Sequence, residues 1–217
     1  MNMDTKVNVN FNAIVTEKGN GFVKAATVAI DRKGNTYETE HLIQLGSKVK
    51  LSKGDYIHCE GHLDTNENGV NLIEPVKLEV LAETPEDLKM NAWIVGEASS
   101  NFIEPKAIDD IASDKKPFGV ATVKLANRFQ RGIVFNNLIP IFRKNLKAGA
   151  VVRLAGRIQY RSYMDKDENE RVNAEIICDN SHTEILKMSR RKNPFAFSEA
   201  TEVSETPKKL VVSEHAV

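Results

Sequence analysis

The stretch LSKGDYIHCEGHL at residues 51–63 recurs as LKAGAVVRLAGRI at residues 146–158. Each copy has a glycine before a strand-like run and a second glycine seven residues later. A glycine inside a strand often marks a bulge or a sharp bend, which a tightly curved small barrel requires. The repeat therefore predicts two β units of one type in a single chain.

Strand patterns surround both copies of the repeat. A second, weaker parallel relates FVKAATVAI at residues 22–30 to FGVATVKL at residues 118–125. Alternating or apolar runs separated by Gly/Asn turns predict five strands in each half. They are residues 7–15, 22–30, 41–45, 55–63 and 70–81 (one strand, or a pair broken at Pro75), then residues 91–95, 120–127, 134–142, 151–163 and 172–178.

These patterns predict an all-β chain with two tandem five-stranded barrels. We expect the first barrel at residues 1–82, a polar linker at residues 83–89 and the second barrel at residues 90–188. Residues 189–217 are rich in Ser, Thr, Glu and Lys, which predicts a disordered, flexible C-terminal tail.

The composition is that of a soluble globular protein, with 41% hydrophobic and 28% charged residues. No apolar run approaches the ~20 residues that a membrane span needs, and the first residues lack the pattern of a secretory signal. The two cysteines, Cys59 and Cys178, lie far apart in strand-like runs and are expected to be buried free thiols. We therefore expect a cytoplasmic protein without membrane contact.

Charge is distributed unevenly, although the chain holds 30 basic and 30 acidic side chains. Residues 115–192 carry 17 Lys/Arg and seven Asp/Glu, whereas residues 1–114 carry 11 and 19. A basic window of strands with interleaved aromatic residues is typical of a nucleic-acid groove. The second barrel is therefore the predicted binder, and the acidic first barrel is expected to serve assembly or partner contact.

Strand alternation assigns faces to residues 151–163. Val152, Leu154 and Ile158 fall on the core face, whereas the other face gathers basic side chains and ends in Tyr163. Arginines two residues apart lie about 6.5–7 Å apart, close to the phosphate spacing of an extended strand. The predicted nucleic-acid-binding residues are Lys124, Arg128, Phe129, Arg131, Phe135, Arg143, Lys144, Arg153, Arg157, Arg161, Tyr163 and Arg171; for the phenylalanines a core position is the alternative.

Other chemistry finds little support in the sequence. His58, Glu60 and His62 share one strand face but lack an evident fourth metal ligand except His41. The run from Asp165 starts like a calcium loop but does not continue as one. We expect no catalytic site, no metal and no cofactor.

The residues of the second half resemble a known family. MNAWIVG (90–96), VATVKLAN (120–127) and LKAGAVVRLAGRIQYRSY (146–163) are similar to strands of bacterial and phage-type single-stranded DNA-binding proteins. The resemblance covers residues 90–187. It implies OB-folds, usually four per assembly, that wrap single strands over aromatic and basic side chains. It places Tyr163 and Phe135 at stacking positions, Phe129 near a third, and Arg143, Arg157 and Arg161 at basic positions.

The chain departs from that family in two respects. It has two predicted OB-folds instead of one, which favours a phage or mobile-element origin and, if four are needed, a homodimer. Its last residues lack the acidic tip ending in Pro-Phe that recruits partners.

The expected function is coating of single-stranded DNA without sequence specificity during replication or recombination, in the host cytoplasm or nucleoid. The alternatives are an adaptor that docks replication or recombination proteins, and a single-stranded RNA binder.

Overall fold

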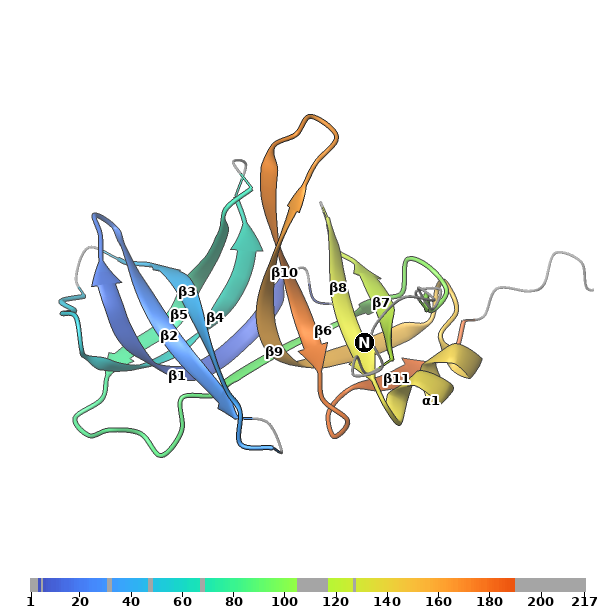
Figure 1. The fold of residues 1–217 in the computed structure, drawn as a ribbon, viewed down its shortest axis with the longest axis horizontal. Helices are drawn as coiled ribbons and strands as arrows, with labels where there is room; N and C mark the ends of the chain where they lie inside the picture. Colours follow the sequence, from blue (N-terminus) through green and yellow to red (C-terminus); the bar gives the residue numbers. More distant parts are fainter. Residues whose placement is uncertain are drawn as a thin grey trace, which may run out of the picture.

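The fold is taken from a computed structural model, which describes residues 4, 6–30, 33–46, 49–66, 69–104, 117–126 and 128–189. The predicted tail lies outside the described residues from position 190 onward. The described part is all-β apart from one helix, as predicted (Figure 1). Its elements are β1 (Val7–Lys18), β2 (Phe22–Ile30), β3 (Thr36–Gln44), β4 (Tyr56–Thr65), β5 (Asn71–Val80), β6 (Met90–Glu97), β7 (Phe118–Lys124), β8 (Phe129–Phe135), α1 (Leu138–Asn145), β9 (Val151–Met164), β10 (Glu170–Cys178) and β11 (Glu184–Lys187).

Strands β1 to β5 pair in a closed circle, which we call the N-terminal ring. Antiparallel pairs join β1 to β2, β2 to β3, β5 to β4 and β4 to β1, and the parallel pair β3–β5 closes the circle. Along β1 every second residue from Val7 to Val15 is buried, so one face of the strand lines the core.

Strands β6 to β10 repeat this order, and we call them the C-terminal ring. Antiparallel pairs join β6 to β9, β9 to β10 and β7 to β8, while β8 and β10 run parallel. A bridge between Ala98 and Val123 connects the end of β6 to β7. The short strand β11 adds to β9 outside this circle. Figure 1 shows the N-terminal ring at the left and the C-terminal ring at the right.

The two rings are joined where β1 pairs antiparallel with β6. Val9 lies opposite Gly61 in the N-terminal ring, and Ala92 lies opposite Gly156 in the C-terminal ring. Val9 and Ala92 thus hold equivalent places, and they are also paired with each other across the junction. The rings are therefore related by an approximate two-fold axis through this pair.

The glycine repeat has the structural role that the sequence predicts. Gly54 and Gly149 both adopt positive φ, which favours glycine. At Gly61 and Gly156 the neighbouring strand approaches so closely that a Cβ atom would overlap the carbonyl oxygens of Glu74 and Ile177. The parallel between residues 51–63 and 146–158 is thus confirmed.

The weaker parallel and one predicted strand need correction. The strand registers place Val23 and Ala121 in equivalent positions, so the parallel drawn from Phe22 to Phe118 was wrong by two residues. The strand predicted at residues 134–142 was also wrong. The strand β8 ends at Phe135, and α1 follows, burying Leu138, Ile139 and Phe142 on one helix face.

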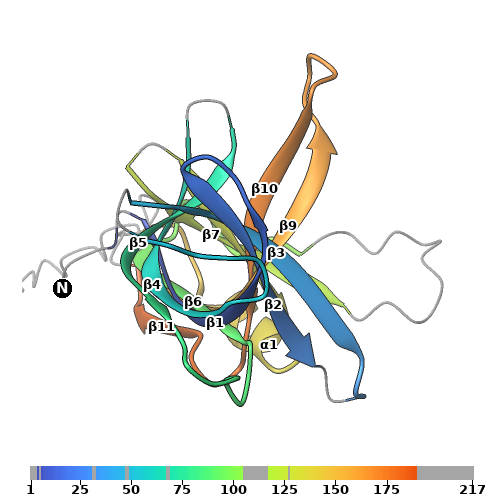
Figure 2. The same ribbon diagram turned by 90° about the vertical axis from the view of Figure 1, so that its left-hand side faces the viewer.

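The core face of β9 was predicted correctly, since Val152, Leu154 and Ile158 are each at most 1% exposed. Cys59 and Cys178 are buried free thiols, as expected, and burial raises the pKa of each to about 12. Beyond the rings, the β9–β10 hairpin projects away from the body of the molecule in both views (Figures 1 and 2).

Candidate nucleic-acid interface

Two adjoining cavities open on the C-terminal ring where β7 leads into β8. Their volumes are about 570 and 530 Å³, and both are lined by Arg128, Phe129, Arg131 and Asn173. We call this surface, with Ser99 and Thr122 at its edge, the β8 groove. A groove lined by an aromatic ring and two arginines suits an extended polyanion with flat, apolar bases.

Phe129 is the aromatic residue of the β8 groove. Its side chain is 62% exposed, although a phenylalanine gains from burial. It begins β8 and pairs in register with Lys124 of β7. The exposed ring and the neighbouring cations together form a platform on which a base can stack.

Arg128 connects the groove to the N-terminal ring. Its guanidinium donates hydrogen bonds to the Leu63 carbonyl oxygen at 2.9 Å and to the Thr65 hydroxyl, and it lies 3.4 Å from the Asp64 carboxylate. Burial lowers the pKa of Arg128, and the charge of Asp64 opposes this shift. The end of β4 therefore forms one wall of the groove and fixes Arg128.

Arg131 combines exposure with a buried partner. One guanidinium nitrogen lies 3.0 Å from the Glu175 carboxylate, which is opposite in the β8–β10 register. Glu175 is only 4% exposed, so Arg131 compensates a buried charge. Its remaining guanidinium surface faces the groove, since Arg131 lines both cavities.

The basic residues predicted on β9 occupy three different surroundings. Arg153 lies opposite Glu184 of β11, and its Nε is buried without a hydrogen-bond partner among the described residues. The Arg157 guanidinium lies over the ring of Tyr37 in the N-terminal ring, 5.5 Å from its centroid. Arg161 and Tyr163 are exposed on the projecting hairpin. The predicted row is thus divided rather than continuous.

The other predicted residues also fall into separate groups. Arg171, on the hairpin, donates to Asp165 at 2.9 Å. Arg143 and Lys144 both lie on α1, and Arg143 donates two 2.6 Å hydrogen bonds to Glu104. Phe135 contacts Phe118 at a centroid distance of 6.2 Å. Phe135 and α1 lie at the far end of β8, about 20 Å from Phe129 at ~3.3 Å per residue.

Sequence reasoning missed the polar residues of the groove. Thr122 and Asn173 lie on β7 and β10, and Thr65 and Asn71 reach it from the N-terminal ring. Asn71 also donates to the Val172 carbonyl oxygen at 2.8 Å, which ties β5 to β10. The sequence carries no signal for these residues, because only the fold brings residue 65 beside residue 128.

Two members of the candidate metal cluster on β4, His58 and Glu60, are engaged in protein contacts. His58 lies 2.9 Å from the Asn12 side-chain oxygen and 3.2 Å from Glu60. Within the described ranges no group of three His, Cys, Asp or Glu side chains could hold a metal ion. Nor is any helix of that part of the chain long and apolar enough to cross a membrane.

Solved structures with a similar fold include single-stranded DNA-binding proteins of Thermus aquaticus. The wild-type protein matches with a TM-score of 0.57 and 14% identity, over 80% of this chain and 93% of that chain. A deletion mutant of it matches with a TM-score of 0.51 and 14% identity, over 80% and 95%. A comparison with curated proteins finds no match. The similarity shows that the chain is an all-β OB-fold protein.

The sequence of the C-terminal ring matches a protein family. Residues 118–185 match the model of the "Single-strand binding protein family". This stretch includes β7 to β10 and the groove residues Arg128, Phe129 and Arg131. The C-terminal ring thus carries the sequence signature of the single-strand binding protein family, and the predicted resemblance to that family is confirmed over residues 118–185.

Proposed function

We propose that the chain binds single-stranded DNA without sequence preference and coats strands exposed during replication or recombination. The observation that carries the proposal is Phe129, an exposed ring that lines the β8 groove together with Arg128 and Arg131. The family match over residues 118–185 supports it, because that stretch contributes Arg128, Phe129 and Arg131 to the groove.

The chemistry of the groove accounts for binding that ignores sequence. Every base has a flat face, so stacking on Phe129 contributes about 1–3 kcal/mol for any base. Lys124, Arg131 and the hairpin residue Arg161 supply cations for the backbone. If about four to six phosphates are neutralised per site, log K falls with log salt at a slope of roughly −3 to −4.

We also propose that each ring is one OB-fold barrel, with residues 1–82 and 90–188 as the two domains and 83–89 between them. The identical pairing order of the two rings supports this division. Two chains would then supply four OB-folds. Light scattering tests the homodimer: a mass near twice 24.2 kDa is expected, and a monomer mass contradicts it.

The test of DNA binding is a titration with oligo-dT and with an equal length of duplex. Trp93 on β6 and the tyrosines report binding by fluorescence at two salt concentrations. Tight, salt-sensitive quenching by the single strand alone is the expected result. Equal binding of both forms contradicts the proposal and leaves general phosphate attraction. Oligo-U in the same assay measures any preference between RNA and DNA.

A further inference from the structure

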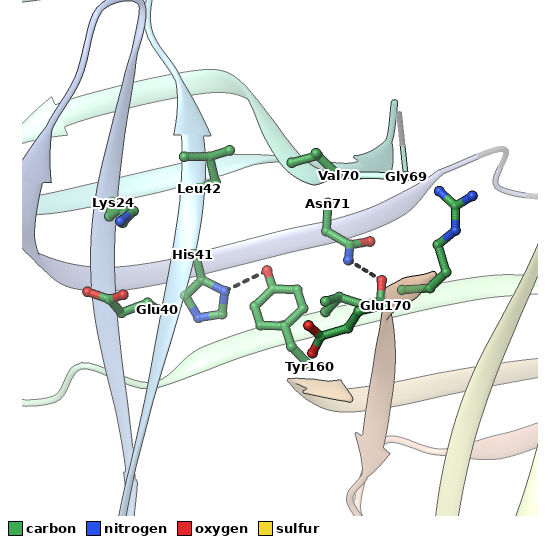
Figure 3. A pocket seen from close by; sticks show the side chains of 11 residues that line it. Lys24, Glu40, His41, Leu42, Gly69, Val70, Asn71, Tyr160 and Glu170 are labelled. Carbon is green, nitrogen blue, oxygen red and sulfur yellow. Dashed lines mark hydrogen bonds between the residues drawn. The ribbon is translucent and has the colours of Figure 1, made fainter. Parts of the chain in front are cut away.

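The N-terminal ring has its own counterpart of the β8 groove, a cavity of about 410 Å³. Gly61 and Gly156 hold equivalent places in the two rings, and the strand registers extend this equivalence to the neighbouring strands. By this correspondence Glu40 takes the place of Phe129, and Leu42 takes the place of Arg131. Lys24 and Val70 likewise replace Thr122 and Asn173. We call this counterpart the N-terminal cleft (Figure 3).

The charges of the N-terminal cleft disfavour nucleic acid. Its two cations already have acidic partners, since Lys24 lies 2.6 Å from Glu17, and Arg171 lies 2.9 Å from Asp165. Glu40 and Glu170 add two carboxylates from opposite sides, one from each ring. Phosphates would meet net negative charge there, so the cleft suits a cationic ligand.

The rest of the lining combines aliphatic side chains with polar groups that are hydrogen-bonded. Leu42, Val70 and Val172 line the cleft together with the two carboxylates, and Val70 and Val172 are 43% and 38% exposed. The Tyr160 hydroxyl is 3.1 Å from His41 Nδ1, and Asn71 is bonded to the Val172 carbonyl oxygen (Figure 3). Both contacts join the two rings. The cleft is therefore preformed, with an aliphatic surface beside two acids.

We propose that the N-terminal cleft binds the segment Lys208-Lys209-Leu210-Val211-Val212 of the same chain. This segment places two cations directly before three aliphatic side chains, which matches the two carboxylates and the exposed aliphatic lining. The 18 intervening residues, 190–207, can span up to about 60 Å when extended, whereas a folded unit of this size has a radius of gyration of about 16 Å. The inference goes beyond DNA binding and does not rest on it.

The test is disulfide trapping in the full chain without nucleic acid. Val70→Cys is combined with Leu210→Cys, and the control combines Ile141→Cys with Leu210→Cys. Ile141 is 50% exposed on α1, so its accessibility matches that of Val70. The native thiols Cys59 and Cys178 are buried, so we expect them to form no disulfide in this assay. We expect an intrachain disulfide to form at least about tenfold faster in the Val70 pair than in the control.

The charges are tested in the same assay. Adding Glu40→Gln and Glu170→Gln to the Val70 pair is expected to slow trapping several-fold, while the control pair is unaffected. Equal rates in the two pairs would overturn the proposal. Disulfides that form only between two chains would also overturn it, in favour of a segment from a second copy. Thermal unfolding of each variant verifies that the rings remain folded.

Discussion

Arg128 and Asp64 belong to different rings, yet the guanidinium of one lies 3.4 Å from the carboxylate of the other. Arg128 also donates to the Leu63 carbonyl oxygen and to the Thr65 hydroxyl. A side chain with three acceptors around it is fixed, and Phe129 follows it directly in the chain. The N-terminal ring therefore positions the aromatic residue of the β8 groove.

This relationship predicts that Asp64→Asn weakens DNA binding although it removes a negative charge beside the groove. Without the ion pair the Arg128 side chain is held less firmly, and the neighbouring Phe129 is positioned less precisely. We expect a several-fold weaker affinity for oligo-dT, with a stability loss of about 1 kcal/mol or less, because Asp64 is partly exposed. The measurement is the fluorescence titration at fixed salt.

The matched control for Asp64→Asn is Glu74→Gln. Glu74 also neighbours Lys6, whereas Arg128 is held by Leu63, Asp64 and Thr65, so the loss of the Glu74 charge does not release the guanidinium. Glu74→Gln is expected to bind as well as the unaltered chain or better. Tighter binding by both variants would mean that Asp64 acts only through its charge.

Phe129→Ala separates stacking from charge. Removing the ring should cost about 1–3 kcal/mol of binding free energy, because the base loses its platform. The slope of log K against log salt should stay unchanged, since no cation is lost. Ile141→Ala, at an apolar site on α1 that is also at least half exposed, is the control and should bind normally. A loss of affinity in both variants would contradict a specific role for Phe129.

Tyr163→Ala tests whether the hairpin belongs to the same binding surface. Tyr163 is 44% exposed on β9 and pairs in register with Arg171. If the bound DNA strand crosses the hairpin, the variant should lose about 1–3 kcal/mol of binding free energy, with the slope of log K against log salt unchanged. An unchanged affinity would confine the interface to the β8 groove.

The fold could be predicted from local pattern wherever one signal determined the structure. The glycine pairs at positions 54 and 61, and 149 and 156, identified the repeat because the first glycine of each pair adopts positive φ and strands approach closely at the second. The strand predicted over residues 134–142 failed because apolar content alone cannot distinguish a short strand from a helix. Asn136-Asn137 before the run and Pro140 in the first helical turn were the available signals of a helix start.

The site was harder to predict because it depends on contacts between distant residues. Sequence alternation placed Arg153, Arg157 and Arg161 on one face of β9 correctly, but it could not show what covers that face. In the structure β11 lies beside Arg153, and Tyr37 lies under Arg157. The wall formed by Thr65 and Asn71 needed the ring-to-ring pairing of β1 with β6, which no local pattern encodes.

Stability should fall with acid through His41. His41 is 1% exposed and lies 2.8 Å from the Thr27 hydroxyl and 3.1 Å from the Tyr160 hydroxyl. Burial lowers its pKa to about 3. As pH falls below about 6.5 the unfolded chain takes up a proton that the folded chain does not, so stability drops by up to about 1.4 kcal/mol per pH unit. The loss levels off below the folded pKa.

The variant His41→Gln isolates this contribution. Gln130 holds the equivalent place in the C-terminal ring and is 2% exposed, so a buried glutamine fits this position of the fold. Urea unfolding at pH 7 and pH 4.5 gives the comparison. The variant should lose less stability between the two pH values than the unaltered chain. An equal loss would assign the acid sensitivity to other groups.

Gly156→Ala tests the close approach of strands on which the repeat depends. A Cβ atom at this position would overlap the carbonyl oxygen of Ile177, and the rigid backbone of β10 cannot move aside cheaply. We expect a loss of about 3 kcal/mol or more, which for a chain of this size lowers Tm by roughly 6–12 °C. Gly46→Ala is the control, because nothing lies within 4 Å of a Cβ there. It should change stability by no more than about 0.5 kcal/mol. Equal melting temperatures for the two variants would show that β9 and β10 can separate without cost, and the glycine would then have no structural reason to recur.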